Sequence, residues 1–184
     1  MKKQNLKIGI AGGGGIGSNV AVHLIRCGVT NFKIVDFDII EESNLNRQFY
    51  FKDQIGKNKV ETLYENLKRI NPHANIEIVN ERIERTNINR IFEDCEILVE
   101  AFDKKEYKKM LIEESYDKKK MIVSASGIAD SDLENIKIKK VSPNLYIVGD
   151  FSKDISLYKT YSPKVVYIAS IMADIVLREG GFYE

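Results

Sequence analysis

Cysteine is scarce in this sequence: Cys27 and Cys95 are the only two among its 184 residues. Neither belongs to a Cys-x-x-Cys pair, so the cysteines cannot form the four-ligand set of a structural zinc site, and no structural zinc is expected. Cys27 falls near the end of an expected helix, and Cys95 lies just before an expected buried strand. Both cysteines are therefore predicted to be small core residues and not nucleophiles.

An excess of charge of either sign is also missing, since 28 Lys and Arg balance 27 Asp and Glu. A protein that binds nucleic acid irrespective of sequence needs a strongly basic face, so no nucleic-acid partner is expected. The lysines of residues 104–105, 108–109 and 118–120 stand among acids and are expected on solvated helix faces.

Long apolar runs are absent as well, and none approaches the roughly 20 residues that a membrane-spanning helix needs. The basic start, Met1–Asn5, runs straight into a strand pattern, whereas a signal peptide would continue into a longer apolar region. We therefore expect a cytoplasmic protein with no membrane partner.

Short apolar strands alternate with helical stretches over residues 6–124. This alternation is typical of a mostly parallel sheet with helices on both faces. After Gly127 the period changes to two, and residues 136–141 and 145–148 predict an antiparallel hairpin at the sheet edge. The expected fold class is therefore α/β and Rossmann-like, and the length fits a single domain over residues 1–184. The other expected strands are residues 6–11, 32–36, 76–79, 96–100 and 121–124, and the expected helices are 18–25, 57–70, 86–92, 104–116 and 162–177.

A glycine-rich turn joins the first expected strand to the first helix. It reads Gly12-Gly13-Gly14-Gly15-Ile16-Gly17 and matches the pattern G-x-G-x-x-G at positions 12, 14 and 17. Glycines let the backbone approach a phosphate, and the helix amino end offers unpaired N–H groups to its negative charge. Asp36 ends the next strand, about twenty residues on, where an acid binds ribose hydroxyls in such folds. An adenine nucleotide is expected, and the loop leaves NAD and ATP equally open.

Two further motifs follow Asp36: Ser43-Asn44-Leu45-Asn46-Arg47-Gln48 and Gly56-Lys57-Asn58-Lys59. The two phosphates of NAD are held mostly by backbone and leave little use for both Arg47 and Lys59. An enzyme that expels pyrophosphate from ATP must neutralise its β- and γ-phosphates, for which a bidentate arginine and a mobile lysine are suited. These residues favour ATP.

Together, these motifs resemble the ThiF/MoeB/E1-like superfamily, which contains the activating enzymes of ubiquitin-like proteins and the adenylyltransferases of sulfur carrier proteins. The shared run is GGGGIGS, DFD, SNLNRQ, GKNK and a helix stop at Asn71-Pro72, and it is most specific over roughly the first 75 residues. The chain is most similar to a short ThiF of thiamine biosynthesis. The resemblance implies ATP- and Mg²⁺-dependent adenylylation of the C-terminal glycine carboxylate of a ThiS-like sulfur carrier ending in Gly-Gly. Pyrophosphate would be released, and a homodimer is implied.

The resemblance also implies roles for individual residues. Asp103 would bind Mg²⁺ through a carboxylate oxygen, although it could also cap the helix that follows it. For Asn44, the alternative to a role at the phosphates is ordinary turn chemistry. For Arg47 and Lys59, the alternative is a surface salt bridge. The implied catalytic residues are Arg47, Lys59 and Asp103, and the implied nucleotide-binding residues are Gly12, Gly14, Gly15, Gly17, Asp36, Asn44 and Gln48.

The sequence departs from this family at several places. Relatives read Asp-x-Thr-Asp-Asn where this chain has Glu100-Ala101-Phe102-Asp103-Lys104. No cysteine follows Cys95, so sulfur would have to reach the acyl-adenylate from another protein. Longer members place an arginine before the first strand, where this chain has Lys2 and Lys3.

Two other functions stay open on the sequence. The glycine loop and Asp36 would also suit an NAD-dependent oxidoreductase. The shortness of the chain would suit a non-catalytic nucleotide-binding scaffold. The sequence does not specify which carrier is activated or in which pathway.

Overall fold

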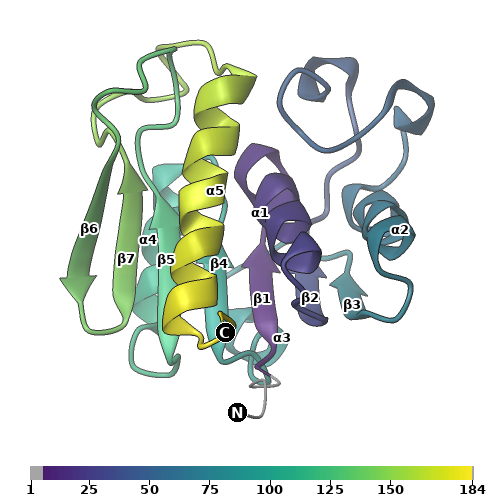
Figure 1. Ribbon diagram of the computed structural model, residues 1–184, viewed down its shortest axis with the longest axis horizontal. Helices are drawn as coiled ribbons and strands as arrows, with labels where there is room; N and C mark the ends of the chain where they lie inside the picture. The colour runs from purple at the N-terminus through teal and green to yellow at the C-terminus, as the bar shows by residue number, and fades with distance from the viewer. Residues whose placement is uncertain (1–5, 184) are drawn as a thin grey trace.

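Seven strands form one sheet in residues 6–183, the part of the chain that the computed structural model describes; Lys2 and Lys3 lie outside it. The strand order is β3-β2-β1-β4-β5-β7-β6 (Figure 1). All neighbouring strands are parallel except β6 and β7, which pair antiparallel at the edge. The strands are β1 Ile8–Ala11, β2 Asn31–Val35, β3 Asn75–Val79, β4 Ile97–Glu100, β5 Met121–Ala125, β6 Lys137–Ser142 and β7 Leu145–Gly149.

Helices cover both faces of this sheet. In Figure 1, α1 and α5 lie side by side in front of the central strands with α2 beside them, and α3 and α4 lie behind. The helices are α1 Gly15–Arg26, α2 Lys59–Ile70, α3 Ile88–Ile91, α4 Lys105–Ser115 and α5 Ser162–Glu179. Two short 3₁₀ helices, η1 Glu42–Asn44 and η2 Lys52–Gln54, lie between β2 and α2.

The central strands are buried on both faces, which explains their continuous apolar sequence. Side chains alternate between two hydrophobic clusters: Val99 and Val123 pack with α1 and α5, whereas Leu98 and Ile122 pack with α3 and α4. The strand β6 differs, because most of its side chains are exposed and three of its six residues are lysines.

The structure confirms the α/β, Rossmann-like fold and every expected strand and helix to within a few residues. The largest difference is the helix expected over residues 86–92, which is the single turn Ile88–Ile91. The edge hairpin is also confirmed, with its turn at residues 143–144. The two 3₁₀ helices were not expected. Across residues 6–183, none of the helices combines the length and apolar character that crossing a membrane requires.

The topology places a crevice at the glycine loop. The chain runs from β1 to β2 and β3 on one side, then returns across the sheet to β4 on the other side of β1. In open parallel sheets, ligands bind at such a switch point, beyond the carboxyl ends of the strands.

The glycine loop depends on a close contact between Gly17 and the backbone of Gly12. A Cβ atom on Gly17 would lie 1.8 Å from the carbonyl oxygen of Gly12, whereas a Cβ on Gly14 would meet only the Gln48 amide, at 3.8 Å. Gly12 has a φ of +105°, a conformation that favours glycine. Glycine is therefore required at positions 12 and 17 by the fold, independently of any ligand.

We predict that Gly17→Ala lowers the free energy of unfolding by roughly 3 kcal/mol or more, because the clash outweighs the ~1 kcal/mol helix preference of alanine. Gly14→Ala is the matched control and should cost about 1 kcal/mol or less, since it only replaces one helix-capping residue by a poorer one. Urea denaturation of both variants checks this, and equal losses of stability would contradict the steric explanation.

Candidate functional site

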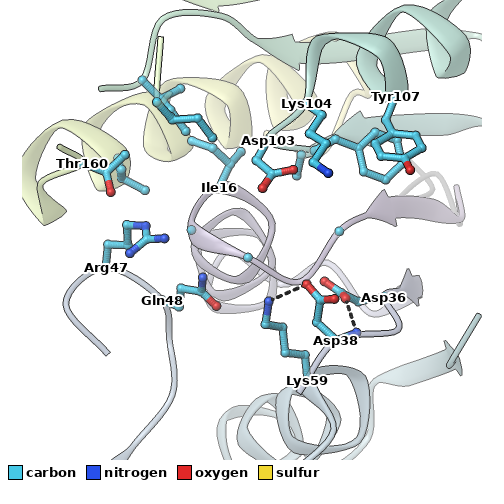
Figure 2. Close-up of a pocket in the computed structure, with 18 of the residues that line it drawn as sticks. Ile16, Asp36, Asp38, Arg47, Gln48, Lys59, Asp103, Lys104, Tyr107 and Thr160 are labelled. Carbon is cyan, nitrogen blue, oxygen red and sulfur yellow. Dashed lines mark hydrogen bonds and ion pairs between the residues drawn. The ribbon is translucent and has the colours of Figure 1, made fainter. Parts of the chain in front are cut away.

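A cavity of about 900 Å³ opens at the carboxyl ends of β1, β2 and β4. Its size lies near the upper end of the range for small-ligand sites, roughly 300–1,000 Å³. Figure 2 shows its lining side chains around the amino end of α1. The residues that line it are Gly12, Gly14–Ile16, Val35–Asp38, Ser43, Asn46–Gln48, Lys59, Glu81–Ile83, Ala101–Lys104, Tyr107, Ile128, Ile155–Tyr161 and Val165.

The glycine loop forms the floor of this cavity. Gly14 precedes α1, no side chain caps the helix, and the first turn carries no acidic residue. The first backbone N–H groups of α1 therefore remain available to a ligand. With the positive end of the helix dipole they form a site suited to a phosphate.

Asp36 supports the loop as well as facing the cavity. One carboxylate oxygen accepts the N–H of Gly13 at 2.6 Å, and the other accepts the N–H of Asp38 at 2.8 Å. From the other side, the Tyr50 hydroxyl donates to the Gly13 carbonyl at 2.7 Å. Burial, assisted by the nearby carboxylates of Asp36 and Asp38, raises the pKa of Tyr50 well above its usual value, so this donor stays protonated.

Lys59 points into the cavity from the first turn of α2. Its ammonium pairs with the Asp38 carboxylate at 3.1 Å, and its side chain is only 8% exposed (Figure 2). Lys59 thus makes the salt bridge that the alternative expected, but its ammonium is buried while the Asp38 carboxylate is half-exposed. A buried ammonium with one partner retains donors for a phosphate.

Arg47 and Gln48 approach the amino end of α1 from the same loop, and in Figure 2 Gln48 lies between Arg47 and Lys59. The Arg47 guanidinium donates to the Asn46 side chain at 2.7 Å and to the Ser43 carbonyl at 3.1 Å. Burial lowers the pKa of Arg47, and the Asp103 carboxylate acts in the opposite direction across the cavity. The Gln48 side-chain oxygen is buried and has no hydrogen-bond partner among the described residues.

Asn44 does not join this group. Its side-chain oxygen accepts the N–H of Glu41 at 3.1 Å and so caps η1. Asn44 is buried but is not among the residues that line the cavity. The contacts of Asn44 are those of turn chemistry, and it supports the loop that carries Arg47.

Asp103 lies at the cavity edge, beyond the end of β4. The structure does not support its alternative role as a helix cap, because Lys104 occupies the cap position of α4 and no side chain caps that helix. The Asp103 side chain faces the amino end of α1 in Figure 2. No cluster of three or more His, Cys, Asp or Glu side chains suited to a metal occurs in the described part of the chain.

Glu100, three residues earlier, is fully buried and fixes the turn before Asp103. Its carboxylate accepts the N–H of Phe102 at 2.7 Å and the Ser124 hydroxyl at 2.5 Å, and it pairs with the Lys108 ammonium at 3.2 Å. The expectation of a solvated helix face is therefore wrong for Lys108, whose side chain is 19% exposed. It is also wrong for Lys119, which donates to the carbonyls of Phe92 and Cys95.

Several lining residues were missed by the sequence analysis. Phe102 and Tyr107 form an aromatic pair with ring centroids 5.8 Å apart, and Arg82 lies 4.6 Å from the centre of the Phe37 ring. Residues 155–161 form another wall of the cavity. No periodic pattern marks these positions, but the DFD motif and the residue before Asp103 could have indicated Phe37 and Phe102.

The two cysteines differ in environment. Cys95 is buried as expected, and burial raises the pKa of its thiol to about 12. Cys27 is exposed, so the prediction of a core position was wrong for it. It follows α1 directly, where the chain turns at the surface.

The fold and the cavity define a Rossmann-like α/β protein with a site for a phosphate-bearing ligand. A family model described as the ThiF family matches residues 2–178, and the chain belongs to this family. The molybdopterin-synthase adenylyltransferase of Haemophilus influenzae is 30% identical over 148 residues, which make up 80% of this chain and 60% of that protein. The adenylyltransferase and sulfurtransferase UBA4 of Candida glabrata is 30% identical over 145 residues, 78% of this chain and 34% of that protein. The chain thus spans only part of the length of these curated relatives.

Solved structures show the same fold at low sequence identity. The E. coli tRNA N6-threonylcarbamoyladenosine dehydratase TcdA, in complex with AMP, superposes with a TM-score of 0.87 at 18% identity, covering 96% of this chain and 86% of that chain. E. coli MccB with ATP superposes with a TM-score of 0.78 at 23% identity, covering 100% of this chain and 58% of that chain.

We predict that Lys108→Met lowers the free energy of unfolding by roughly 3 kcal/mol, because it leaves the Glu100 carboxylate buried without its counter-charge. Lys109→Met is the matched control: Lys109 is 76% exposed and pairs with Glu113 along the helix, so it should change stability by less than about 0.5 kcal/mol. Thermal or urea unfolding measures both, and a neutral Lys108→Met would show that Glu100 does not need the pair.

We predict that native protein at pH 8 exposes one thiol to a disulfide reagent such as DTNB, and that this thiol is Cys27. Cys95 should react only after unfolding, because its pKa of about 12 and its burial leave almost no accessible thiolate at this pH. Cys27→Ser should abolish the native reaction, and rapid labelling of Cys95 in that variant would contradict its burial.

Proposed function

We propose that the chain is an ATP-dependent adenylyltransferase that activates the C-terminal carboxylate of a ubiquitin-like sulfur carrier protein. The observation that carries the proposal is the pair of cationic side chains, Arg47 and Lys59, on either side of the glycine-loop anion site. Membership in the ThiF family supports it, as do the two adenylyltransferase relatives and the neighbouring structures with AMP and ATP.

In this proposal the nucleotide lies over the glycine loop. The amides at the start of α1 bind phosphate oxygens, and Asp36 accepts a ribose hydroxyl while its other bonds hold the loop. Lys59 and Arg47 neutralise the charge that develops on the departing phosphates. Gln48 lines the cavity beside the glycine loop, next to the nucleotide in this proposal.

Asp103 is the residue that would hold Mg²⁺. One carboxylate at the cavity edge is compatible with this ion, which uses few protein ligands and completes its shell with phosphate oxygens and water. When bound, Mg²⁺ would neutralise phosphate charge and make pyrophosphate a better leaving group.

The carrier supplies the nucleophile. One oxygen of its terminal carboxylate attacks the α-phosphorus in line and forms an acyl-adenylate, a mixed anhydride. The bond from the α-phosphorus to the oxygen that bridges it to the β-phosphate breaks, and pyrophosphate leaves with that oxygen. The protein contributes position and charge stabilisation without a covalent intermediate of its own. The carrier tail would approach along the wall formed by Ile128 and residues 155–161, because the glycine-loop side is occupied by the nucleotide.

We further propose a ThiS-like carrier ending in Gly-Gly, in the formation of the thiamine thiazole. Its support is the resemblance to a short ThiF over the GGGGIGS, SNLNRQ and GKNK motifs. A single adenylyltransferase domain over residues 1–184, cytoplasmic location and a homodimer belong to the same proposal. The oxidoreductase alternative is less well supported, because two cations line the phosphate side of the cavity. The non-catalytic scaffold is also less well supported, because a protein that only binds a nucleotide would not need a buried lysine such as Lys59 in the cavity.

We predict that the protein with Mg²⁺ catalyses ATP–pyrophosphate exchange with a sulfur carrier ending in Gly-Gly from the same organism, and not with a carrier whose tail is deleted. Exchange should fall about 100-fold in Arg47→Ala and in Lys59→Ala, the loss expected for one transition-state donor. Lys57→Ala is the control, because Lys57 is exposed and outside the cavity lining. Full exchange in both cavity variants would refute the assigned roles, and tight NAD binding without exchange would favour the oxidoreductase.

A further inference from the structure

Lys164 is fully buried at the start of α5, although lysine is among the residues least often buried. Its ammonium lies 2.5 Å from the Asp150 carboxylate, 2.8 Å from the Asp130 carboxylate and 2.5 Å from the Ala129 carbonyl. The Asp150 side chain is itself 2% exposed. Ala129 and Asp130 belong to the loop after β5, Asp150 begins the loop after β7, and Lys164 lies in α5. Lys164 therefore joins these two loops to the helix.

The backbone of these two loops is tightly constrained. Asp130 and Phe151 are the two non-glycine residues with positive φ among the described residues, at +68° and +64°. A Cβ atom on Gly149 would lie 1.7 Å from the Ser126 carbonyl oxygen, and one on Gly127 would lie 2.1 Å from the Asp150 carboxylate. Strained backbone of this kind persists only where surrounding contacts hold it, and it gathers at functional sites.

The same two loops carry a wall of the cavity. Ile128, next to Ala129, lines it, and Asp130 pairs with Thr160 in an isolated parallel bridge through a 2.8 Å bond from its N–H to the Lys159 carbonyl. Val165, next to Lys164, also lines it and lies so close to the glycine loop that a Cβ on Gly15 would meet it at 3.1 Å. Two contacts of Lys164, Ala129 and Asp130, are thus one and two residues from Ile128, and the third, Asp150, begins the loop that leads to the wall residues 155–161.

We propose that Lys164, with Asp130 and Asp150, is a positioning cluster that fixes the cavity wall of Ile128 and residues 155–161 and thereby sets the affinity for the acyl substrate. The cluster touches no reacting atom, and it acts through the wall. The inference rests on the proposed function, because that function places the carrier tail along this wall and the nucleotide along the glycine loop. Loss of the cluster therefore affects carrier binding more than ATP binding.

A second buried lysine offers a matched comparison. Lys33 is 7% exposed, pairs with Asp94 at 2.7 Å and Glu77 at 3.1 Å, and donates to the Ile91 carbonyl. Its chemistry is the same as that of Lys164, but it lies on β2 beside strand β3, and none of its partners lines the cavity. Lys33→Met therefore controls for loss of a buried lysine without a change in the cavity wall.

Lys164→Met leaves the buried Asp150 carboxylate without the Lys164 ammonium, whereas Asp130 retains Lys153 at 3.8 Å. This single variant could fail to fold, so the double variant Lys164→Met/Asp150→Asn accompanies it. Asparagine at position 150 retains an oxygen that can accept the N–H groups of Ser152 and Lys153, which bond the Asp150 carboxylate at 2.7 and 2.9 Å. The double variant thus removes the buried charge pair and keeps the turn.

The experiment measures three quantities in the full chain: the KM for a Gly-Gly-terminated sulfur carrier in ATP–pyrophosphate exchange, the Kd for ATP, and hydrogen exchange of three amides. These are the amides of Leu157 and Tyr158 in the wall, and that of Asp130, which donates to the wall at Lys159. We expect the Lys164 variants to raise the carrier KM by about tenfold, less than the ~100-fold that a misplacement of about 1 Å can cost in catalysis. The ATP Kd should change little, and exchange at the three amides should accelerate. Lys33→Met should leave all three quantities as in the native protein.

An unchanged carrier KM in a folded Lys164 variant would overturn the inference, as would equal effects of Lys33→Met. If the native protein adenylylates no carrier, the proposed function fails. Hydrogen exchange still decides the positioning claim in that case, because loss of protection at the wall in the Lys164 variants alone supports it and unchanged protection refutes it.

Discussion

The carbonyl oxygen of Gly12 lies so close to Gly17 that no side chain fits between them. This contact brings the amino end of α1 against the end of β1 and points the first amides of the helix at the cavity. Asp36 and Tyr50 then hold Gly13 from two sides, and Val165 of α5 closes over Gly15. The polar residues of the site are arranged around this short turn, and their positions depend on it.

Much of the fold follows from local pattern, because a strand buried on both faces must be apolar throughout and a helix on its surface must be apolar on one side. The glycine loop and Asp36 were predictable for the same reason, since each depends on residues near it in the sequence. The two 3₁₀ helices were not predictable from periodicity. They depend on caps such as the Asn44 side chain, whose oxygen accepts a backbone N–H three residues earlier.

The buried lysines show where sequence reasoning fails. Lys33, Lys108 and Lys164 each have carboxylate partners, and those of Lys33 and Lys164 include residues 61 and 34 positions away in sequence. In sequence, such a lysine cannot be told from one on a solvated face, because burial is decided by which acid the fold brings opposite to it. The wall of residues 155–161 was missed for a related reason, since its conformation depends on Asp130, Asp150 and Lys105 and not on any repeat of its own.

The edge strand β6 has its own physical consequence. A strand at the border of a sheet presents unpaired backbone groups that can recruit the strand of another molecule, and lysines along it oppose such pairing. Lys137, Lys139 and Lys140 place like charges along this border, so two copies brought edge to edge would repel one another. The lysines of β6 therefore disfavour extension of the sheet across this border by a second copy.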